Sequence, residues 1–454
     1  MYLFDSSHVW HVAKSGSDTN GGHAQQYPIS LASDAKLTIQ AAVNVASDGD
    51  KIVIWPGTYS ESVDATSKQL HLVGTSRENC VIQIVQIGSN SSLANLSVVV
   101  PATVANAAML INTKDNIVIE NCFFETLREE QAGYGCLRID DSSNIVIRNS
   151  YINASGYGIR AFDSGVVLEG CWIKSTARFT YQNAAGLYFT NSAGKLDRQV
   201  LAVDCKFILD RNYSISSTAT ASIVAVDQTN RVFTVEGDAT GNLSQGDKIC
   251  VVLSAGNDGQ YTVSGVEYDN EEEQSEVTVS ESIPDGTADG QLGKSSTEPA
   301  HGVLCNGFGT FNNCVVYAGG GSYTASDVKG VTVLTDKRML LNCCSIFTEE
   351  NHASATAYDV YNEGTIVAVG SIYEANKVSG TVVQGGSGWA EGVNAEVDKA
   401  ITDASVDKAV KMLMNKAVQN KVTGSIQYYG DGGQTVILTH TPSESQTEIT
   451  RMPS

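Results

Sequence analysis

Residues 117–124 read IVIENCFF, and this short pattern decides the fold because it returns along the chain. It consists of an apolar strand, then Asn, Asp or Gly, then Cys or Ser, and then an apolar or aromatic pair. Further copies read IVIRNSYI, VVLEGCWI, LAVDCKFI, TFNNCVVY, LLNCCSIF and VAVGSIYE. With the Cys or Ser in register, the repeat positions are Cys122, Ser150, Cys171, Cys205, Cys314, Cys344 and Ser371. Short β-branched strands that recur with Gly and Asn turns predict a parallel β-solenoid, in which each coil stacks on the next around one continuous core.

One interval in this repeat is out of proportion. The repeat positions are separated by 28, 21, 34, 109, 30 and 27 residues. Inside the long interval, residues 216–295 alternate apolar and polar residues and carry turn signals at 228–230, 257–259 and 285–286. The acidic run EEEQSE at 271–276 fits a solvated hairpin tip better than a calcium loop, because the glycine and alternating oxygen donors of such a loop are missing. Without these 80 residues the interval is 29, so we predict a small antiparallel β-domain inserted in one loop of the coil.

The two ends of the chain depart from the repeat. Residues 34–47 predict a short amphipathic capping helix, whose apolar positions are Leu37, Ile39, Ala42, Val43 and Ala46. From residue 392 a second helical stripe begins, formed by Val397, Ile401, Ala404, Val410, Leu413 and Ala417. Two strand-like runs around an Asp-Gly-Gly turn follow, in SIQYYGDGGQTVILTHT at 425–441. The predicted domains are therefore 1–215 (cap and first coils), 216–295 (insertion), 296–391 (remaining coils) and 392–454 (helix and β-hairpin module).

The second stripe is an ordinary core-packing helix or an oligomerisation seam. It is short and Asp407 interrupts it, so a coiled coil is permitted rather than required.

Composition limits the partners and the cofactors. The 50 acidic and 29 basic residues of this 454-residue chain give a net charge of −21, which would repel nucleic acid, anionic lipid and acidic glycans unless a local basic groove offset it, and the sequence shows no such groove. No apolar run approaches 18 residues, and MYLFDSSHVWHV lacks the parts of a secretory signal, so we expect no membrane partner and folding in a reducing cytosol. The ten cysteines form no CxxC pair and have no His at ligand spacing. We therefore expect buried thiols, no metal and no cofactor.

The first coils resemble a known superfamily. The segments HVAKSGSDTNGG, LTIQAAVNVASDGDKIVIWPGTYSESV, LHLVGTS and CVIQI are similar to the start of right-handed parallel β-helix proteins of the pectin lyase-like superfamily. The similarity covers roughly residues 8–390 without the insertion, and it implies a fold rather than an activity. The Asp motif of the pectin methylesterases and the GHG motif of the polygalacturonases are absent, and Asp50 and Glu61 match no catalytic motif.

Two other segments resemble structural proteins of tailed bacteriophages. These are FTVEGDATGNLSQGDKICVV with GNDGQYTVSGV and SIPDGTADG in the insertion, and IQYYGDGGQTVILTHTPSESQTEITRMPS at the end of the chain. The resemblance implies a virion protein of the tail, neck or capsid surface, assembled in the host cytoplasm beside other virion proteins and contributing to host attachment. It also implies a homo-oligomer, for which we prefer a trimer.

An enzyme of this fold would need paired carboxylates with a basic neighbour on the coil exterior. GCLRIDDSSNIVIRNS and GYGIRAFDSGVVLEG align at an offset of 22 residues, which stacks Arg138 on Arg160 and Asp141 on Asp163. A polysaccharide lyase or glycoside hydrolase that depolymerises a host-surface glycan is thus the alternative function, and Arg148 would extend the arginines into a basic strip.

The structural interpretation of the aspartates is stronger, because the column continues as a ladder of Asn, Asp and Thr at one turn of each coil. Its further members are Thr113, Asn191, Asn306, Thr335 and Asn362. We therefore assign no catalytic residue. A bacterial surface β-helix is a third reading, disfavoured by the missing signal.

Overall fold

The chain divides into two compact units, residues 1–383 and 384–454. The computed structural model describes residues 8–23, 29–101, 104, 106–127, 135–176, 179–180, 184–192, 195, 198–211, 215–295, 299–320, 327–350, 356–385, 417–419, 426–429, 436–444 and 449–453. The predicted C-terminal helix after residue 392 lies outside these residues, apart from Ala417, which begins a strand.

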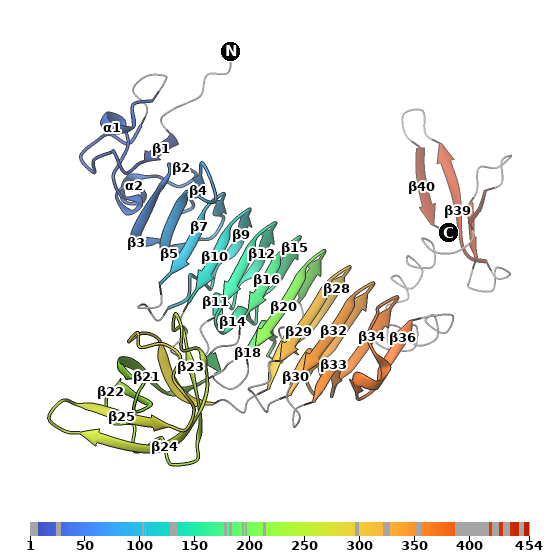
Figure 1. The fold of residues 1–454 in the computed structure, drawn as a ribbon. Helices are drawn as coiled ribbons and strands as arrows, with labels where there is room; N and C mark the ends of the chain where they lie inside the picture. Colours follow the sequence, from blue (N-terminus) through green and yellow to red (C-terminus); the bar gives the residue numbers. More distant parts are fainter. Residues whose placement is uncertain are drawn as a thin grey trace. The chain divides into compact units, whose positions relative to one another are not determined.

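The body of the first unit is a right-handed parallel β-helix (Figure 1). The repeat predicts the parallel solenoid, and the family resemblance implies its right hand. Each coil contributes one strand to each of three faces, and every strand pairs in parallel with its counterpart in the next coil. The first face is the 12-stranded sheet, and the 17-stranded sheet supplies the other two.

The first face contains β1 (Val9–Val12), β2 (Lys51–Ile54), β4 (His71–Gly74), β6 (Ser92–Ala94), β9 (Asp115–Glu120), β12 (Ser143–Arg148), β15 (Val166–Glu169), β19 (Val200–Val203), β28 (Phe308–Asn312), β31 (Arg338–Asn342), β34 (Thr365–Val369) and β36 (Val382–Gly385). The second face contains β7 (Ser97–Val100), β10 (Phe123–Thr126), β13 (Tyr151–Ala154), β16 (Trp172–Ser175), β20 (Lys206–Arg211), β29 (Val315–Gly320) and β32 (Ser345–Glu350). The third face contains β8 (Met109–Asn112), β11 (Gly135–Asp140), β14 (Tyr157–Phe162), β18 (Ala184–Thr190), β27 (Ala300–Asn306), β30 (Val328–Val333), β33 (Ala357–Asn362) and β35 (Val378–Ser379). In the first coils, β3 (Gly57–Ala65) and β5 (Cys80–Ile87) run across both of these faces.

The register of the second face confirms the repeat read from the sequence. The residue after each Cys or Ser of the repeat pairs with its counterpart in the next coil: Phe123, Tyr151, Trp172, Lys206, Val315, Ser345 and Ile372. Lys206 pairs directly with Val315, so the coil resumes after the insertion without a shift.

The turn between the first and second faces explains the residue types of the repeat. Asn121, Asn149 and Gly170 have φ values of 49°, 48° and 60°, a left-handed conformation that Asn, Asp and Gly adopt at least cost. At the next position a small donor is needed, because the side chain bonds a carbonyl oxygen of its own turn. Cys122 Sγ lies 3.3 Å from Glu120 O, and Ser150 Oγ donates to Arg148 O at 2.8 Å.

One apolar core fills the coil from the first strands to β34, with alternate residues of each strand pointing inward. Its largest fully buried side chains include Phe124, Phe189, Phe207 and Phe311. Burial of a side chain of this size stabilises the fold by about 1.5–3 kcal/mol, so the stacked coils share one hydrophobic driving force.

Two short helices close the first coil: α1 (Leu31–Asp34) and α2 (Ile39–Val45). The carboxylate of Glu61 accepts from the backbone N–H groups of Ile39 and Gln40 at 2.9 and 3.0 Å, so it caps α2. Ile39, Ala42 and Val43 are buried as predicted, whereas Leu37 is 37% exposed because it precedes the helix.

Asp50 is the second acid that the structure gives a role in this cap. It is 2% exposed and accepts from Trp10 Nε1 and Ser47 N, each at 2.8 Å, and its Oδ1 lies 2.7 Å from His8 Nδ1. Burial alone would raise the pKa of Asp50, but these hydrogen bonds outweigh it and lower the pKa. Asp50 and Glu61 therefore fasten the cap to the coil.

A separate seven-stranded sheet consists of six strands between β20 and β27 and one short strand, β17, that lies between β16 and β18 in the chain. Its strands are β17 (Phe179–Thr180), β21 (Ile215–Asp227), β22 (Val232–Glu236), β23 (Lys248–Val252), β24 (Gly259–Asp269), β25 (Gln274–Val279) and β26 (Gln291–Ser295), with a core of their own. The strands pair antiparallel, as predicted, with one exception: β17 pairs in parallel with β21. The sequence did not indicate β17. The first half of the acidic run, residues 271–273, lies at the exposed tip of the β24–β25 hairpin as expected, whereas residues 274–276 begin β25, where Ser275 is buried.

The second unit contains a four-stranded antiparallel sheet of β37 (Ala417–Gln419), β38 (Ile426–Tyr429), β39 (Val436–Glu444) and β40 (Ile449–Pro453). The predicted hairpin is β38 with β39, and His440 is a strand residue of β39. The predicted boundaries between domains stay predictions. Among the described residues, no helix has the length and apolarity to cross a membrane.

Candidate functional site

The third face carries the arginines that the sequence singled out. Arg138 on β11 pairs in register with Arg160 on β14, as the 22-residue alignment predicts. Both side chains are outside the coil, because their strand neighbours Leu137, Ile139 and Ile159 fill the core. The two guanidinium groups therefore lie on adjacent coils of one exterior surface.

The acid that joins them is Asp140, which the sequence interpretation passed over in favour of Asp141. Arg138 Nε donates to Asp140 Oδ2 at 2.6 Å, and the two side chains are 29% and 18% exposed. The alternation of a strand was the available signal, because residues two apart point to the same side. Arg138 and Asp140 are two apart on β11, whereas Asp141 follows the last strand residue.

Aromatic rings surround Arg160. Its guanidinium carbon lies 4.2 Å from the centroid of the Phe162 ring and 6.0 Å from that of Tyr157. Tyr188, on the next coil, stacks on Tyr157 at 5.7 Å and meets Phe162 edge-on at 5.8 Å. Burial lowers the pKa of Arg160 from its ordinary value, but a guanidinium remains a cation in proteins. The result is a cation held against an aromatic surface beside an ion pair.

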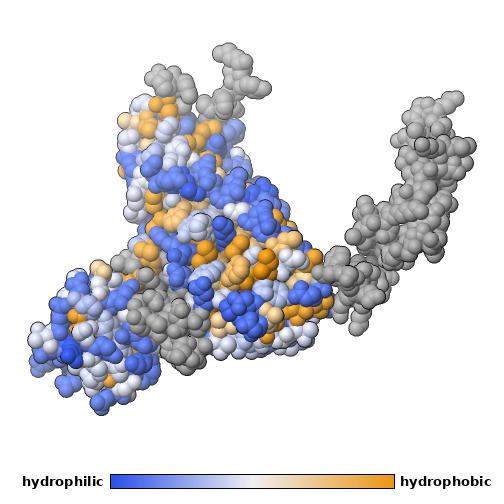
Figure 2. All heavy atoms as spheres, turned by 45° about the vertical axis from the view of Figure 1, so that its right-hand side comes forward, coloured by the Kyte–Doolittle hydropathy of each residue, from blue (hydrophilic) through white to orange (hydrophobic). Residues whose placement is uncertain are grey.

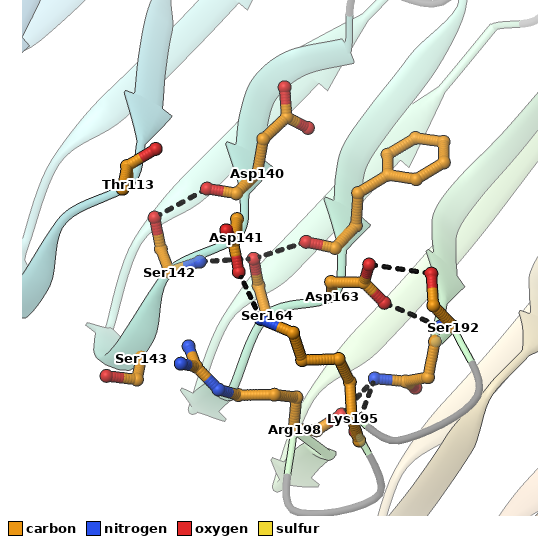
Figure 3. Close-up of polar contacts among 12 residues, drawn as sticks. Thr113, Asp140, Asp141, Ser142, Ser143, Asp163, Ser164, Ser192, Lys195 and Arg198 are labelled. Carbon is orange, nitrogen blue, oxygen red and sulfur yellow. Dashed lines mark hydrogen bonds and ion pairs between the residues drawn. The ribbon is translucent and has the colours of Figure 1, made fainter.

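Asp141 and Asp163 occupy the turn that follows the third face (Figure 3). Both have a left-handed backbone, with φ values of 42° and 46°. Asp141 Oδ1 accepts from Lys195 Nζ at 2.7 Å, and this hydrogen bond and the lysine charge lower the pKa of Asp141. Asp163 accepts from the backbone N–H of Ser192 at 2.6 Å and from its hydroxyl at 2.8 Å. Each carboxylate therefore fastens its turn to the loop at residues 192–195.

The serines that follow these aspartates continue the pattern. Ser142 N donates to Ser164 Oγ at 3.0 Å, while Ser142 Oγ donates to Asp140 O at 2.7 Å (Figure 3). Ser164 Oγ donates to Phe162 O at 2.6 Å. A buried hydroxyl thus satisfies the backbone groups of the turn, as Ser150 does at the turn between the first and second faces.

The ladder predicted for this turn is correct only in its first half. The turn position runs through Thr113, Asp141, Asp163 and Asn191, since each backbone N–H bonds the carbonyl that precedes the turn of the next coil. The prediction is wrong for Asn306 and Asn362: Asn306 pairs with Thr190 rather than Asn191, and Asn362 pairs with Val333. Both are the last residues of their strands, β27 and β33, and so precede the turn.

Arg148 does not join the arginines of the third face. It lies on β12 of the first face, where Arg148 Nε bonds Glu169 Oε2 at 2.6 Å. These two side chains are 45% and 43% exposed, so the pair contributes less than about 1 kcal/mol. The predicted basic strip is therefore reduced to Arg138 and Arg160.

The guanidinium of Arg160 and the rings around it have the chemistry to contact a planar anionic group or a sugar. Among the described residues of this face, Asp140 is the acid that forms an ion pair with an arginine. No cluster of three or more His, Cys, Asp or Glu side chains with metal-binding geometry occurs in the described part of the chain.

Comparisons with known proteins concern the fold. Residues 69–233 match the family model described as a right handed beta helix region. Pectate lyase Pel9A has a TM-score of 0.38 and 11% identity, over 82% of this chain and 78% of its own. A protein of Geobacillus virus E2, ORF18, also has a TM-score of 0.38 and 11% identity, over 99% of this chain and 76% of its own. A pectin methylesterase bound to a hexasaccharide has a TM-score of 0.40 and 10% identity, over 84% of this chain and 94% of its own. No curated protein matches the sequence. These likenesses carry no argument about activity.

Proposed function

We propose that this chain is a structural component of a bacteriophage particle, in the tail, neck or capsid surface, and that it contributes to attachment to the host. The observation that carries the proposal is that Asp141 and Asp163 form structural contacts at the turns of the coil. Both are left-handed turn residues whose carboxylates fasten a loop to the coil. The sequence resemblance of the insertion and the last strands to phage structural proteins supports the virion assignment.

In this proposal the exterior acids maintain the stacking of a rod, and the insertion and the C-terminal unit provide the surfaces that meet other virion proteins. Electron microscopy of purified particles, with an antibody raised against residues 216–295, tests the assignment. We expect label at one repeated position on the particle. Particles that contain no label, when the same antibody binds the purified protein, would refute the assignment.

A second candidate is a depolymerase that cuts a host-surface glycan, and the third face favours it. Arg138, Asp140 and Arg160 combine an ion pair, a second cation and aromatic rings on one exterior surface. Such a surface suits a sugar carboxylate, and Asp140 would serve as the acid or base.

Release of oligosaccharide from host envelope material by the purified protein tests this candidate. Asp140→Asn should abolish the release, whereas Asp163→Asn should preserve it because Asp163 binds Ser192 in the turn. Equal activity of the wild type and Asp140→Asn, or loss only in Asp163→Asn, would contradict the role given to Asp140.

A further inference from the structure

The second face exposes an unusual share of the large apolar side chains. Seven such side chains are exposed in the described residues, and four of them lie on this face or continue its strands: Leu127, Trp172, Phe347 and Ile372, at 38%, 43%, 44% and 62%. Half-buried apolar residues occupy several of the outward positions between them, and others carry Glu125, Asn153, Lys174, Lys206 and Ser345. We call the whole set the apolar face; its members are Phe123, Leu127, Tyr151, Trp172, Ile208, Val315, Tyr317, Phe347 and Ile372. Figure 2 shows apolar groups gathered on the exterior of the coil.

The position of this set cannot be a by-product of core packing. The residues that alternate with it, such as Phe124, Ile173 and Phe207, are the ones that fill the core. Solvent-facing positions of a sheet normally carry polar residues, and a contiguous exposed apolar patch marks an interaction surface.

The outward positions of the second face carry few charges: Lys174 and Lys206 against Glu125, Asp210 and Glu349, a net charge of −1. Lys174 lies 3.3 Å from Asp210, Glu125 accepts from Asn153 at 2.7 Å, and Glu349 accepts from Tyr317 at 3.1 Å. Lys206 Nζ lies 5.3 Å from the centroid of the Trp172 ring. In a chain of net charge −21 this face is thus close to neutral, so bringing two copies together here adds little repulsion.

The rings are arranged for protein packing rather than for sugar binding. Phe123 and Tyr151 stack on each other with centroids 5.5 Å apart and planes 14° apart, and Tyr151 meets Trp172 edge-on at 5.4 Å. Two of the three rings therefore cover each other's faces, which a pyranose would need to be free. The aliphatic members, such as Ile372 and Leu127, offer a sugar no hydrogen bond.

The length of the face fits a stable interface. From Phe123 to Ile372 it crosses seven paired levels of the coil. Six steps of about 4.8 Å make it about 29 Å long. Its strands have four to six residues, so at about 3.3 Å per residue the face is about 13–20 Å wide and covers about 400–600 Å². Two such faces bury about 800–1,200 Å² in total, which reaches the lower end of the range for specific interfaces. A surface that repeats at the strand spacing is best complemented by another of the same period, and a second copy of this chain provides one.

We infer that the apolar face is the interface between copies of this chain, with their coil axes side by side and parallel, so that residues of equal height meet. The inference does not depend on membership in a virion, and it places the seam on the coil rather than on the predicted C-terminal helix.

Analytical ultracentrifugation of the full chain tests the inference. We expect the wild type to be an oligomer, and Phe347→Glu to raise the dissociation constant at least a hundredfold because it buries a carboxylate in an apolar contact. Ile372→Lys should have the same effect, and its 62% exposure makes it compatible with folding. The matched control is Val45→Glu, which places the same charge on a 49% exposed apolar residue of α2 and should leave the oligomer intact.

Cross-linking tests the parallel arrangement. The substitution Cys343→Ser removes the one exposed native thiol, and Ile372→Cys then places a new thiol on the apolar face. A short bismaleimide should join two copies of this double variant through residue 372. A monomeric wild type, oligomers that persist in both face variants, or a failure of residue 372 to cross-link in an intact oligomer would each overturn the inference.

Discussion

Asn121 provides a quantitative test of the turn that builds the coil. It has a φ of 49°, and its Nδ2 donates to Asn95 Oδ1 at 2.8 Å, while its Oδ1 accepts from Arg77 at 3.2 Å. Asn121→Ala loses these two bonds, worth about 0.5–1.5 kcal/mol each. It also replaces Asn, which tolerates the left-handed region, with Ala, which does so at a cost of about 1–2 kcal/mol. We expect a total loss of about 2–5 kcal/mol in the free energy of unfolding.

Asn121→Gly separates the two contributions. It loses the same hydrogen bonds but adopts the left-handed conformation without strain, so it should be about 1 kcal/mol more stable than Asn121→Ala. Glu120 is the control, because it is exposed on β9 one residue earlier in ordinary strand conformation. There the order should reverse, with Gly less stable than Ala by about 0.5–1 kcal/mol.

Urea unfolding of the four variants, followed by far-UV circular dichroism, measures these differences. The same rank order of Gly and Ala at both positions would refute the reasoning, because it would show that the left-handed turn does not select Asn.

A Cβ at Gly302 would lie 2.5 Å from Val316 Cγ1 and 2.7 Å from Gly330 O, so Gly302→Ala should lower the unfolding free energy by about 1–3 kcal/mol, whereas Gly265→Ala, with open space around it, should not. Cys343 is the one exposed thiol of the ten, and burial raises the pKa of Cys305 to about 12, so a native-state maleimide pulse read by peptide mass spectrometry should label Cys343 first. The folded-state pKa of Asp50 is lowered, so its carboxylate should stabilise the fold fully above the ordinary aspartate pKa of about 4. This stabilisation should be lost as the pH falls through the folded-state pKa. The difference in unfolding free energy between the wild type and Asp50→Asn, measured in urea from about pH 7 downward, should therefore become smaller. A constant difference would contradict the last prediction.

The coil register could be predicted from the sequence because its turn has strict chemical requirements. A left-handed residue followed by a small hydrogen-bond donor leaves few residue types at two positions, and this makes Cys122, Ser150 and Cys171 recognisable across different strands. The insertion was recognisable because its antiparallel strands alternate apolar and polar residues and meet at tight turns.

The candidate site was harder to predict because it depends on which side of the coil a residue points to. Asp140 and Asp141 are adjacent in sequence, yet one bonds Arg138 on the third face and the other bonds Lys195 at the turn. The contacts of Lys195 and Ser192 come from a loop that belongs to no repeat. Asn306 and Asn362 end their strands rather than occupying the turn position of the predicted ladder, a shift that sequence alignment did not reveal.

Quantitative mass spectrometry of purified phage particles, with isotope-labelled peptides from both units of the chain as standards, tests most directly whether this chain is a structural protein of the particle. We expect a fixed copy number per particle that is a multiple of the oligomer measured in solution. Absence of the chain from particles, or a copy number that varies with purification, would contradict it.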